Sequence, residues 1–213
     1  EAQKEKYLRP TIAAKLCCAE ALTEPRGGSD FFGSTTVAAK SGGYYCLNGQ
    51  KRFVVGAEGA DYFVVYAKTD PDAPSRKALS LFAVDKKMGV EVKYLYGLMG
   101  TRGGGAGRIL FRDVKVPKSN LVGPLHGGGA VFHTMMVPER LCSAAPCTGG
   151  MQASLDVAMS YADRRKAFGR PIRKFQAVSF MIAKAQTLID VSRAMIYQAA
   201  IAADRDTPSL RRI

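Results

Sequence analysis

A loop at residues 22–30 carries the densest group of side chains that could bind a ligand. It reads Leu-Thr-Glu-Pro-Arg-Gly-Gly-Ser-Asp, and its proline and glycines exclude a regular helix or strand. Such a loop leaves several backbone N–H groups free to converge on an anion, with the hydroxyls of Thr23 and Ser29 beside them. The alternative is an ordinary surface turn capped by Asp30. The loop is not a P-loop, because no Gly-Lys-Ser/Thr follows it.

Cysteine and histidine offer little for metal chemistry. The cysteines at positions 17, 18, 46, 142 and 147 form no Cys-x-x-Cys pair, and there are 2 histidines. We therefore expect no metal site, reduced thiols and a cytoplasmic protein. No apolar run approaches the length of about 18 residues that a membrane span needs, and the first residues do not resemble a signal peptide. We expect no membrane association.

The formal net charge of +13 is compatible with three kinds of protein. It could serve a nucleic-acid surface, attract phosphorylated ligands, or belong to one part of a protein whose acidic part lies elsewhere. Basic residues are dispersed, with one run of three at residues 164–166 and short pairs such as residues 211–212. Dispersed charge is a weak indication of a nucleic-acid groove.

Short strand-like runs follow the loop, and residues 1–15 resemble the tail of a helix that precedes it. Gly42-Gly43 and Asn48-Gly49 are hairpin signals between the first three runs. A glycine run at residues 101–107 is not followed by a helix, which excludes a dinucleotide-binding fold. Strands without intervening helices predict an antiparallel sandwich or barrel. The runs are residues 35–40, 44–47, 53–55, 63–68, 79–84, 90–95 and 108–116.

Beyond Pro117 the hydrophobic period becomes helical. We expect residues 118–129 to be a linker, and Pro146 with Gly149-Gly150 to kink or break the first helix. Apolar faces run through residues 151–162 and 175–203. The second face has small apolar side chains that pack tightly, either within the subunit or against another subunit. Because two antiparallel helices rarely bury both apolar faces alone, we expect the chain to be a fragment.

Taken in order, these segments resemble the acyl-CoA dehydrogenase family over nearly the whole chain. Each motif alone is weak, but their shared order and spacing are specific. The motifs are Leu22-Thr-Glu-Pro25 with Gly28-Ser-Asp30, Leu47-Asn-Gly-Gln-Lys51, Met99-Gly-Thr-Arg102, Phe111-Arg-Asp-Val-Lys-Val-Pro117, Glu139-Arg140, and Arg165-Lys-Ala-Phe-Gly-Arg-Pro-Ile172 followed by Phe175-Gln176.

The resemblance implies an α+β fold, with an antiparallel β-sandwich or barrel domain followed by the first helices of an up-down four-helix bundle. It assigns residues 1–20 to the end of an N-terminal helical domain and residues 21–124 to a middle β-domain that binds flavin and acyl-CoA. Residues 125–213 are assigned to a partial C-terminal bundle. The rest of the N-terminal domain and of the bundle is expected outside this chain.

The resemblance implies FAD as the cofactor. Leu22 and Thr23 hold positions that meet the polar edge of the flavin ring, and Ser29 a position that contacts the cofactor pyrophosphate or CoA. Phe53 and Val55 stand where the family usually has Trp and Thr or Ser, against the flavin face opposite the acyl chain. Phenylalanine can still stack there, whereas valine cannot hydrogen-bond near flavin N5.

A second set of cofactor residues is implied near the middle of the helical region. Arg165, Phe168, Phe175 and Gln176 resemble residues that meet the ADP half of a flavin bound in a neighbouring subunit. A guanidinium suits a diphosphate, and a phenyl ring can pack on adenosine. The resemblance therefore implies a homo-oligomer, either a dimer or a tetramer. Taken alone, an arginine such as Arg165 is more often a solvated charge.

The implied reaction is α,β-dehydrogenation of an acyl-CoA thioester in fatty acid metabolism, with an electron-transfer flavoprotein as acceptor. A carboxylate removes the α proton while the β hydrogen passes as hydride to flavin N5. In isovaleryl- and long-chain-type members this base immediately precedes an arginine, which makes Glu139 the catalytic candidate. Ser29, Val137 and Arg140 are the implied substrate contacts. Pro138 leaves open that Glu139 is only a favourable first-turn carboxylate.

Two alternatives remain. Val55 in place of a hydroxyl keeps open an acyl-CoA oxidase or a flavin monooxygenase on the same fold, in which oxygen reaches the reduced flavin. The net charge keeps open a nucleic-acid-associated member of the fold, which the dispersed basic residues and the intact flavin motifs make the least favoured.

Overall fold

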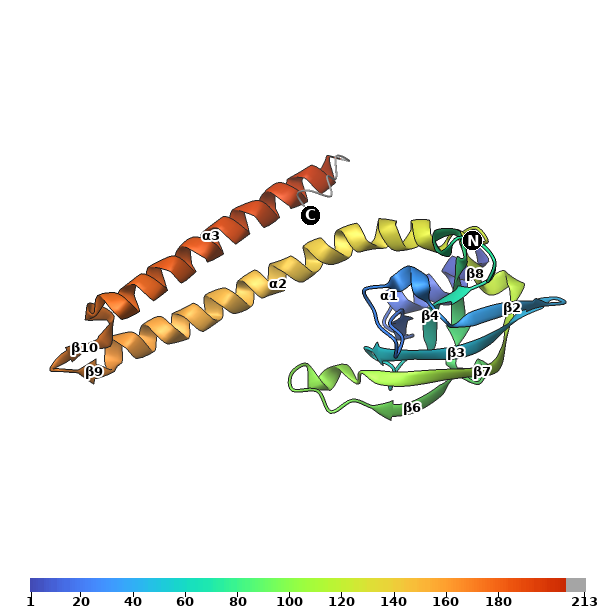
Figure 1. Cartoon of the computed structure of the whole chain (residues 1–213), viewed down its shortest axis with the longest axis horizontal. Coiled ribbons are helices and arrows are strands. Elements are labelled where there is room, and N and C mark those ends of the chain that lie inside the picture. The colour runs from blue at the N-terminus through green and yellow to red at the C-terminus, as the bar shows by residue number, and fades with distance from the viewer. Residues whose placement is uncertain (206–213) are drawn as a thin grey trace. The chain divides into compact units, whose positions relative to one another are not determined.

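The computed structural model describes residues 1–205, and the chain divides into two compact units, Glu1–Phe132 and His133–Ile213. We call them unit 1 and unit 2. Unit 1 contains an eight-stranded sheet in the order β6-β7-β3-β2-β4-β5-β8, with β1 beside β4 (Figure 1). The strands are β1 (Cys18–Ala21), β2 (Val37–Ser41), β3 (Tyr44–Val54), β4 (Tyr62–Lys68), β5 (Leu79–Asp85), β6 (Glu91–Leu95), β7 (Gly107–Pro117) and β8 (Leu121–Val122). As expected, helical residues precede them, at Lys4–Leu8 and in α1 (Arg9–Ile12).

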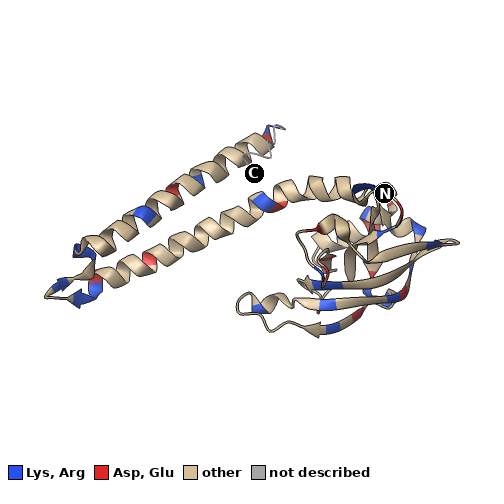
Figure 2. Cartoon of the chain, viewed as in Figure 1, with Lys and Arg blue, Asp and Glu red and all other residues tan. Residues whose placement is uncertain are grey.

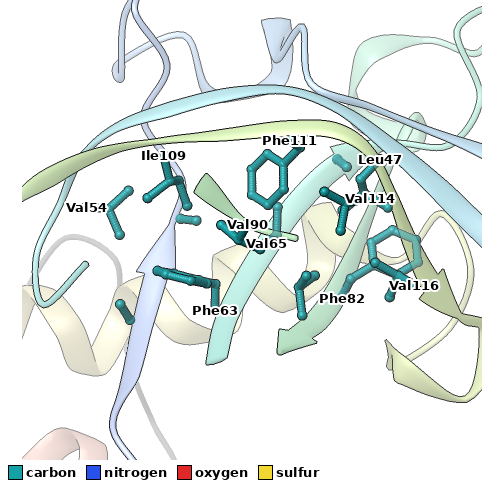
Figure 3. Close-up of a cluster of buried hydrophobic side chains, with 14 of the residues drawn as sticks. Leu47, Val54, Phe63, Val65, Phe82, Val90, Ile109, Phe111, Val114 and Val116 are labelled. Carbon is teal, nitrogen blue, oxygen red and sulfur yellow. The ribbon is translucent and has the colours of Figure 1, made fainter. Parts of the chain in front are cut away.

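The core of unit 1 lies between the β3–β7 pair and the β4–β5 pair (Figure 3). Phe63 and Val65 of β4 and Phe82 of β5 are fully buried, and they face Ile109 and Phe111 of β7. Full burial of one such side chain stabilises the fold by about 1.5–3 kcal/mol. The sheet thus closes over a single apolar layer, and the expected sandwich-like β-domain followed by helices is confirmed.

The β2–β3 connection agrees with one hairpin signal and contradicts the other. Gly42-Gly43 forms the turn, because Ser41 pairs with Tyr44 across it. The prediction of a second hairpin at Asn48-Gly49 was wrong, since β3 runs without interruption through both predicted runs. Its register with β7 shifts between Leu47 and Gly49, and Asn48 exchanges two 2.9 Å hydrogen bonds with Asp113. The turn-forming residues therefore build a bulge inside a long strand.

Two parallel pairings join the antiparallel ones. Strand β1 pairs with β4 from Cys18 opposite Tyr62 to Ala21 opposite Val65. Strand β2 meets the same strand only where Val37 lies opposite Lys68. The sequence did not predict β1, because its Cys-Ala-Glu-Ala composition carries little intrinsic strand preference. Its pairing places the end of β1, and hence the start of the 22–30 loop, against the centre of the sheet.

The helical region begins earlier and runs longer than the sequence predicted. The expected linker contains β8, in which Val122 pairs with Leu81 of β5. Helix α2 (Gly128–Arg164) then continues through Pro138, Pro146 and the Gly149-Gly150 pair, so the helix is not broken there, and a kink at these residues stays a prediction. Its first turn packs inside unit 1: a Cβ on Gly128 would lie 2.9 Å from the Leu79 carbonyl oxygen.

Unit 2 is a helical hairpin. Strands β9 (Lys166–Ala167) and β10 (Arg170–Pro171) form the connection, and α3 (Gln176–Asp204) returns alongside α2 (Figure 1). Arg193 Nη2 donates a 3.2 Å hydrogen bond to Gln152 Oε1 between the two helices. Large apolar side chains remain exposed on both helices, at Val157, Phe180, Met181, Val191, Met195 and Tyr197. No helix within residues 1–205 is long and apolar enough to cross a bilayer.

Gly49 offers a direct test of the bulge. It has φ +144°, and a Cβ there would lie 2.7 Å from Thr36 Cα. We expect Gly49→Ala to lower the free energy of unfolding by about 2–3 kcal/mol, because the methyl group meets backbone and the conformation is strained. Gly43→Ala in the adjacent turn is the matched control, since a Cβ there has nothing within 4 Å. Urea denaturation of both variants checks the difference, and equal stabilities would contradict the close approach of Gly49 to Thr36.

Candidate functional site

The buried carboxylate of Glu24 organises the segment between β1 and β2, residues 22–36. Glu24 is only 2% exposed. Its Oε1 accepts hydrogen bonds from Ser34 Oγ at 2.5 Å and from the Thr36 backbone N–H at 2.9 Å. Its Oε2 accepts from the backbone N–H and the hydroxyl of Thr35, both at 2.7 Å. One carboxylate thus joins the beginning of the segment to its end.

Lys51 of β3 is the counter-ion, and it is completely buried. Its Nζ donates to Glu24 Oε1 at 3.0 Å, to the Leu22 carbonyl oxygen at 3.1 Å and to Ser34 Oγ at 3.3 Å. An ammonium group has three N–H donors, and each has an acceptor here. The buried pair therefore meets the condition under which charges are tolerated away from water.

The electrostatics agree with an ionised pair. Burial alone raises the pKa of the Glu24 carboxyl, but the Lys51 ammonium and the hydrogen bonds from Ser34 and Thr35 outweigh it and hold that pKa well below its usual range. Burial lowers the pKa of the Lys51 ammonium, and the Glu24 carboxylate opposes this change. The donors around Glu24 leave little room for a proton, so we assign the carboxyl as charged.

Thr23 combines a fixed backbone with a free side chain. Its carbonyl oxygen accepts a 2.8 Å hydrogen bond from the Arg52 backbone N–H, which fastens the loop to β3. Within residues 1–205 its hydroxyl has no hydrogen-bond partner. A Cβ on Gly28 would lie 3.1 Å from that hydroxyl, so glycine leaves the space around it open. The neighbouring Leu22 carbonyl is already bound by Lys51, as described above.

Ser29 lies in the exposed part of the loop. The structure there also agrees with the alternative prediction of a surface turn capped by Asp30. The Asp30 side chain accepts a 3.2 Å hydrogen bond from the Gly33 backbone N–H and so caps the short helical turn at Phe31–Gly33. Arg26 Nη1 forms a 2.8 Å ion pair with Asp30 Oδ2. The loop is therefore a capped turn at its surface and an anchored segment at its buried side.

Phe53 lies at the end of β3, where the ladder with β7 shifts between Lys51 and Val54, and Val55 directly follows the strand. Phe53 has φ +54° and is 43% exposed. Its ring contacts Tyr96 with centroids 4.5 Å apart, and the Arg52 Cζ lies 4.1 Å from its centroid. Val55 is 65% exposed and brings no hydroxyl to this surface.

The predicted catalytic and substrate residues of unit 2 lie on α2. Glu139 and Arg140 are exposed, and Val137 is half-buried. Because α2 begins at Gly128, Glu139 lies well beyond the first helical turn. The alternative that it is simply a first-turn carboxylate is therefore wrong. Its assignment as the base stays a prediction.

The other predicted cofactor residues of unit 2 gather at the β9–β10 hairpin. Phe168 is 95% exposed, with φ +51° at the tip of the turn. Its ring meets that of Phe175 edge to face, with centroids 6.1 Å apart. The Arg165 carbonyl oxygen accepts from the Ile172 backbone N–H at 2.9 Å, and Gln176 begins α3. The hairpin thus brings these four residues together, while their contact with a cofactor stays a prediction.

Sequence reasoning missed Glu24, Lys51 and Arg52. Lys51 lies between the predicted runs at residues 44–47 and 53–55, so no local pattern marked it as buried, and lysine is almost never fully buried unless it is paired. Both members of the pair also stand inside motifs quoted for the family resemblance, Leu22-Thr-Glu-Pro25 and Leu47-Asn-Gly-Gln-Lys51. No local feature of the sequence indicates that Glu24 and Lys51 pair with each other.

The buried pair predicts a pH-dependent stability. Because the folded-state pKa of Glu24 is depressed, its contribution is complete above the ordinary pKa of 4.5 and is lost as pH falls toward the folded-state value. We expect Glu24→Gln to reduce the free energy of unfolding by about 3–5 kcal/mol at neutral pH, because Lys51 loses its counter-ion. The difference in free energy of unfolding between Glu24→Gln and the parent should become smaller below pH 4.5. Urea denaturation across this range checks both effects.

Glu58→Gln is the matched control, because Glu58 is an exposed carboxylate of the same unit. We expect it to change stability by no more than about 0.5 kcal/mol. Equal losses in the two variants, or a Glu24→Gln deficit that does not change with pH, would contradict the ionised buried pair.

Relatives of known identity resemble the chain along nearly its whole length. It is 42% identical over 201 residues to the caffeyl-CoA reductase-Etf complex subunit CarC of Acetobacterium woodii, covering 94% of this chain and 53% of that one. It is 37% identical over 206 residues to the mitochondrial isovaleryl-CoA dehydrogenase of Pongo abelii, and this match covers 96% of this chain and 49% of the relative. The solved FAD complex of PigA superposes with a TM-score of 0.92 at 34% identity, covering 97% and 54%.

The chain spans about half the length of the curated relatives it matches. Family models nevertheless cover most of its residues. The acyl-CoA dehydrogenase middle domain matches residues 19–114, and the acyl-CoA dehydrogenase C-terminal domain matches residues 126–213. On the strength of both matches, the chain belongs to the acyl-CoA dehydrogenase family.

Proposed function

We propose that this chain forms the flavin- and substrate-binding part of an FAD-dependent acyl-CoA dehydrogenase. The observation that carries the proposal is the segment at residues 22–36, fixed by the buried Glu24–Lys51 pair. This segment holds Thr23, whose hydroxyl has no partner in the described part of the chain, next to Arg52, and Arg52 precedes the exposed ring of Phe53. Membership of the family and the FAD complex of a relative support flavin as the ligand.

The donor set of unit 1 fits a flavin. The Nε of Arg52 is buried without a partner among the described residues, and the Thr23 hydroxyl is free to donate or accept. An isoalloxazine has a polar edge for such groups and an aromatic face for Phe53. Thr23, Phe53 and the backbone of Leu22 are the residues that would hold it, with Ser29 near its phosphates. When bound, FAD supplies an acceptor for a hydride from the acyl chain.

Residues of unit 2 complete the proposed cofactor site across a subunit boundary. The exposed Phe168 ring meets the half-buried Phe175 ring, and Arg170 lies over Phe175 with Cζ 4.3 Å from the ring centroid. Arg165 and Gln176 add polar groups beside them. Such a surface suits an adenosine diphosphate group, because an aromatic ring can stack on adenine while guanidinium groups bind phosphate. A homo-oligomer of two or four subunits would present it to a neighbour's cofactor.

Glu139 is the proposed base for the α proton of an acyl-CoA thioester, with Val137 and Arg140 as neighbouring substrate contacts. A carboxylate that removes a proton in one direction returns it in the other, so one site can oxidise an acyl-CoA or reduce an enoyl-CoA. One relative is named a dehydrogenase and another a reductase in an Etf complex. We propose dehydrogenation, with an electron-transfer flavoprotein as the acceptor, in a cytoplasmic enzyme of fatty acid metabolism.

Substitution of Glu139 tests this reaction. We expect Glu139→Gln to keep its yellow flavin, because the side chain lies outside the proposed cofactor contacts. Anaerobic bleaching by acyl-CoA thioesters should slow by about 10²–10⁴-fold, the usual contribution of a general base. Stopped-flow absorbance with thioesters of several chain lengths measures the effect.

Asp156→Asn is the control for that experiment, because Asp156 is an exposed carboxylate farther along α2. It should bleach at the parent rate. Retained bleaching in Glu139→Gln would assign the base to another residue while leaving the flavin site in place.

Val55 favours a second candidate on the same fold, an acyl-CoA oxidase or a flavin monooxygenase. It is exposed and provides no hydroxyl beside the flavin, a position where oxygen could approach. For a dehydrogenase we expect the substrate-reduced flavin to reoxidise much more slowly in air than with an electron-transfer flavoprotein. Stopped-flow absorbance after mixing with oxygenated buffer measures the rate, and rapid reoxidation in air would support the second candidate.

The charge distribution gives little support to a nucleic-acid function. Lys and Arg are spread along the strands of unit 1 and the helices of unit 2, with Asp and Glu among them (Figure 2). A nucleic-acid groove normally needs basic side chains gathered along one face.

A further inference from the structure

Arg52 has an unusual position for a side chain near the end of a strand. It follows the buried Lys51 and precedes the exposed Phe53, at the point where the register with β7 shifts. In a regular strand, neighbouring side chains point to opposite faces. Here the positive φ of Phe53 breaks that alternation, and the Arg52 guanidinium lies over the Phe53 ring.

The guanidinium is only partly satisfied by the protein. Its Nη1 donates a 3.2 Å hydrogen bond to the Pro25 carbonyl oxygen. Its Nε is buried without a hydrogen-bond partner among the described residues. A buried donor left without an acceptor costs free energy, so native structures retain such groups rarely and often for a functional reason. The group lies between the Thr23 loop and the Phe53 ring, and both belong to the proposed flavin site.

The lack of a hydrogen-bonding group on Val55 leaves a role for the charged guanidinium of Arg52 nearby. It stands where the family usually provides a hydroxyl near the flavin, and valine can neither donate nor accept a hydrogen bond. A guanidinium carries a permanent positive charge and five N–H donors. Arg52 lies three residues before Val55, and the same bulge that exposes Phe53 also brings the Arg52 guanidinium over the Phe53 ring.

We infer that Arg52 is a positioning and electrostatic residue for the flavin: it donates to the polar edge of the isoalloxazine and raises the reduction potential of the cofactor. This inference rests on the proposed FAD function. A positive charge beside the ring favours the reduced form, which carries more negative charge than the oxidised form. Arg52 therefore makes the flavin easier to reduce, in place of the absent hydroxyl.

Arg108 provides a control from the same surface. Its Nε donates a 3.0 Å hydrogen bond to Gln50 Oε1, and its Nη2 contacts the same oxygen. It carries the same charge as Arg52, but its Nε already has an acceptor. A general effect of positive charge would involve both arginines, whereas a specific contact with the flavin would involve Arg52 alone.

The test is the reduction potential of the FAD-loaded chain, measured by spectroelectrochemical titration of the parent and of Arg52→Met, Arg52→Lys and Arg108→Met. At a fixed electrode potential, Arg52→Met should lower the ratio of reduced to oxidised flavin at least tenfold, about 30 mV for a two-electron couple. Arg52→Lys should lie between Arg52→Met and the parent, because it keeps the charge and loses the planar fork. In Arg108→Met, the ratio of reduced to oxidised flavin should remain within threefold of the parent ratio.

An Arg52→Met variant that binds FAD and keeps the parent ratio would overturn the role of Arg52 and leave the flavin function intact. An equal change in Arg108→Met would also overturn it, because the effect would then come from charge in general. If Arg52→Met does not fold, a parent-like ratio in Arg52→Lys and in Arg52→Gln would overturn the inference. A parent chain that takes up no FAD would overturn the proposed function and this inference together.

Discussion

The ion pair between Glu24 and Lys51 is the constraint on which the rest of the site depends. Both side chains are removed from water, and taking two charges out of water costs several kcal/mol per ion. The cost is offset because the carboxylate also receives hydrogen bonds from Ser34, Thr35 and Thr36. Those donors are available only when the segment at residues 22–36 folds back on itself. The charge pair therefore specifies one loop conformation, since any other leaves a buried charge without partners.

As a consequence, the loop has an inner side whose polar groups are hydrogen-bonded within the protein and an outer side that can meet a ligand. Its inner side is saturated, with the Leu22 carbonyl bound to Lys51 and the Thr23 carbonyl bound to the Arg52 backbone. On its outer side the Thr23 hydroxyl has no partner within residues 1–205, and the loop ends in the cap formed by Asp30. A ligand that meets this loop finds its polar groups already ordered, so binding does not have to order the backbone. Preorganisation of this kind is what a cofactor site needs.

The sequence predicted those parts of the fold that depend on local pattern. Alternation and the Gly42-Gly43 turn identified the β2–β3 hairpin, and the helical period identified α3. It failed where distant contacts outweigh local preference. Asn48-Gly49 has the chemistry of a turn, but Asn48 is held across the sheet by Asp113, which is 65 residues away. Likewise, β1 forms because it pairs in parallel with β4, and nothing in its own four residues predicts that pairing.

The candidate site divides in the same way. Thr23 and Ser29 could be predicted as site residues because loop chemistry and family motifs are local, whereas Glu24 and Lys51 meet across 27 residues and form no spacing pattern. Arg52 was missed for a different reason: strand alternation predicts that it points away from Phe53, and only the bulge reverses this.

The loop anchored by Glu24 also supports the helix that follows unit 1's sheet. Phe31, directly after the Asp30 cap, stacks on Phe132 in the first turns of α2, with ring centroids 3.9 Å apart. Gly129 allows that turn to approach, because a Cβ there would lie 2.9 Å from the Arg76 carbonyl oxygen. A disturbance of the buried pair would therefore reach both the Thr23 hydroxyl and the first residues of α2, which belong to unit 1. The proposed flavin contacts and the seating of α2 in unit 1 are thus two outcomes of the same buried charge pair.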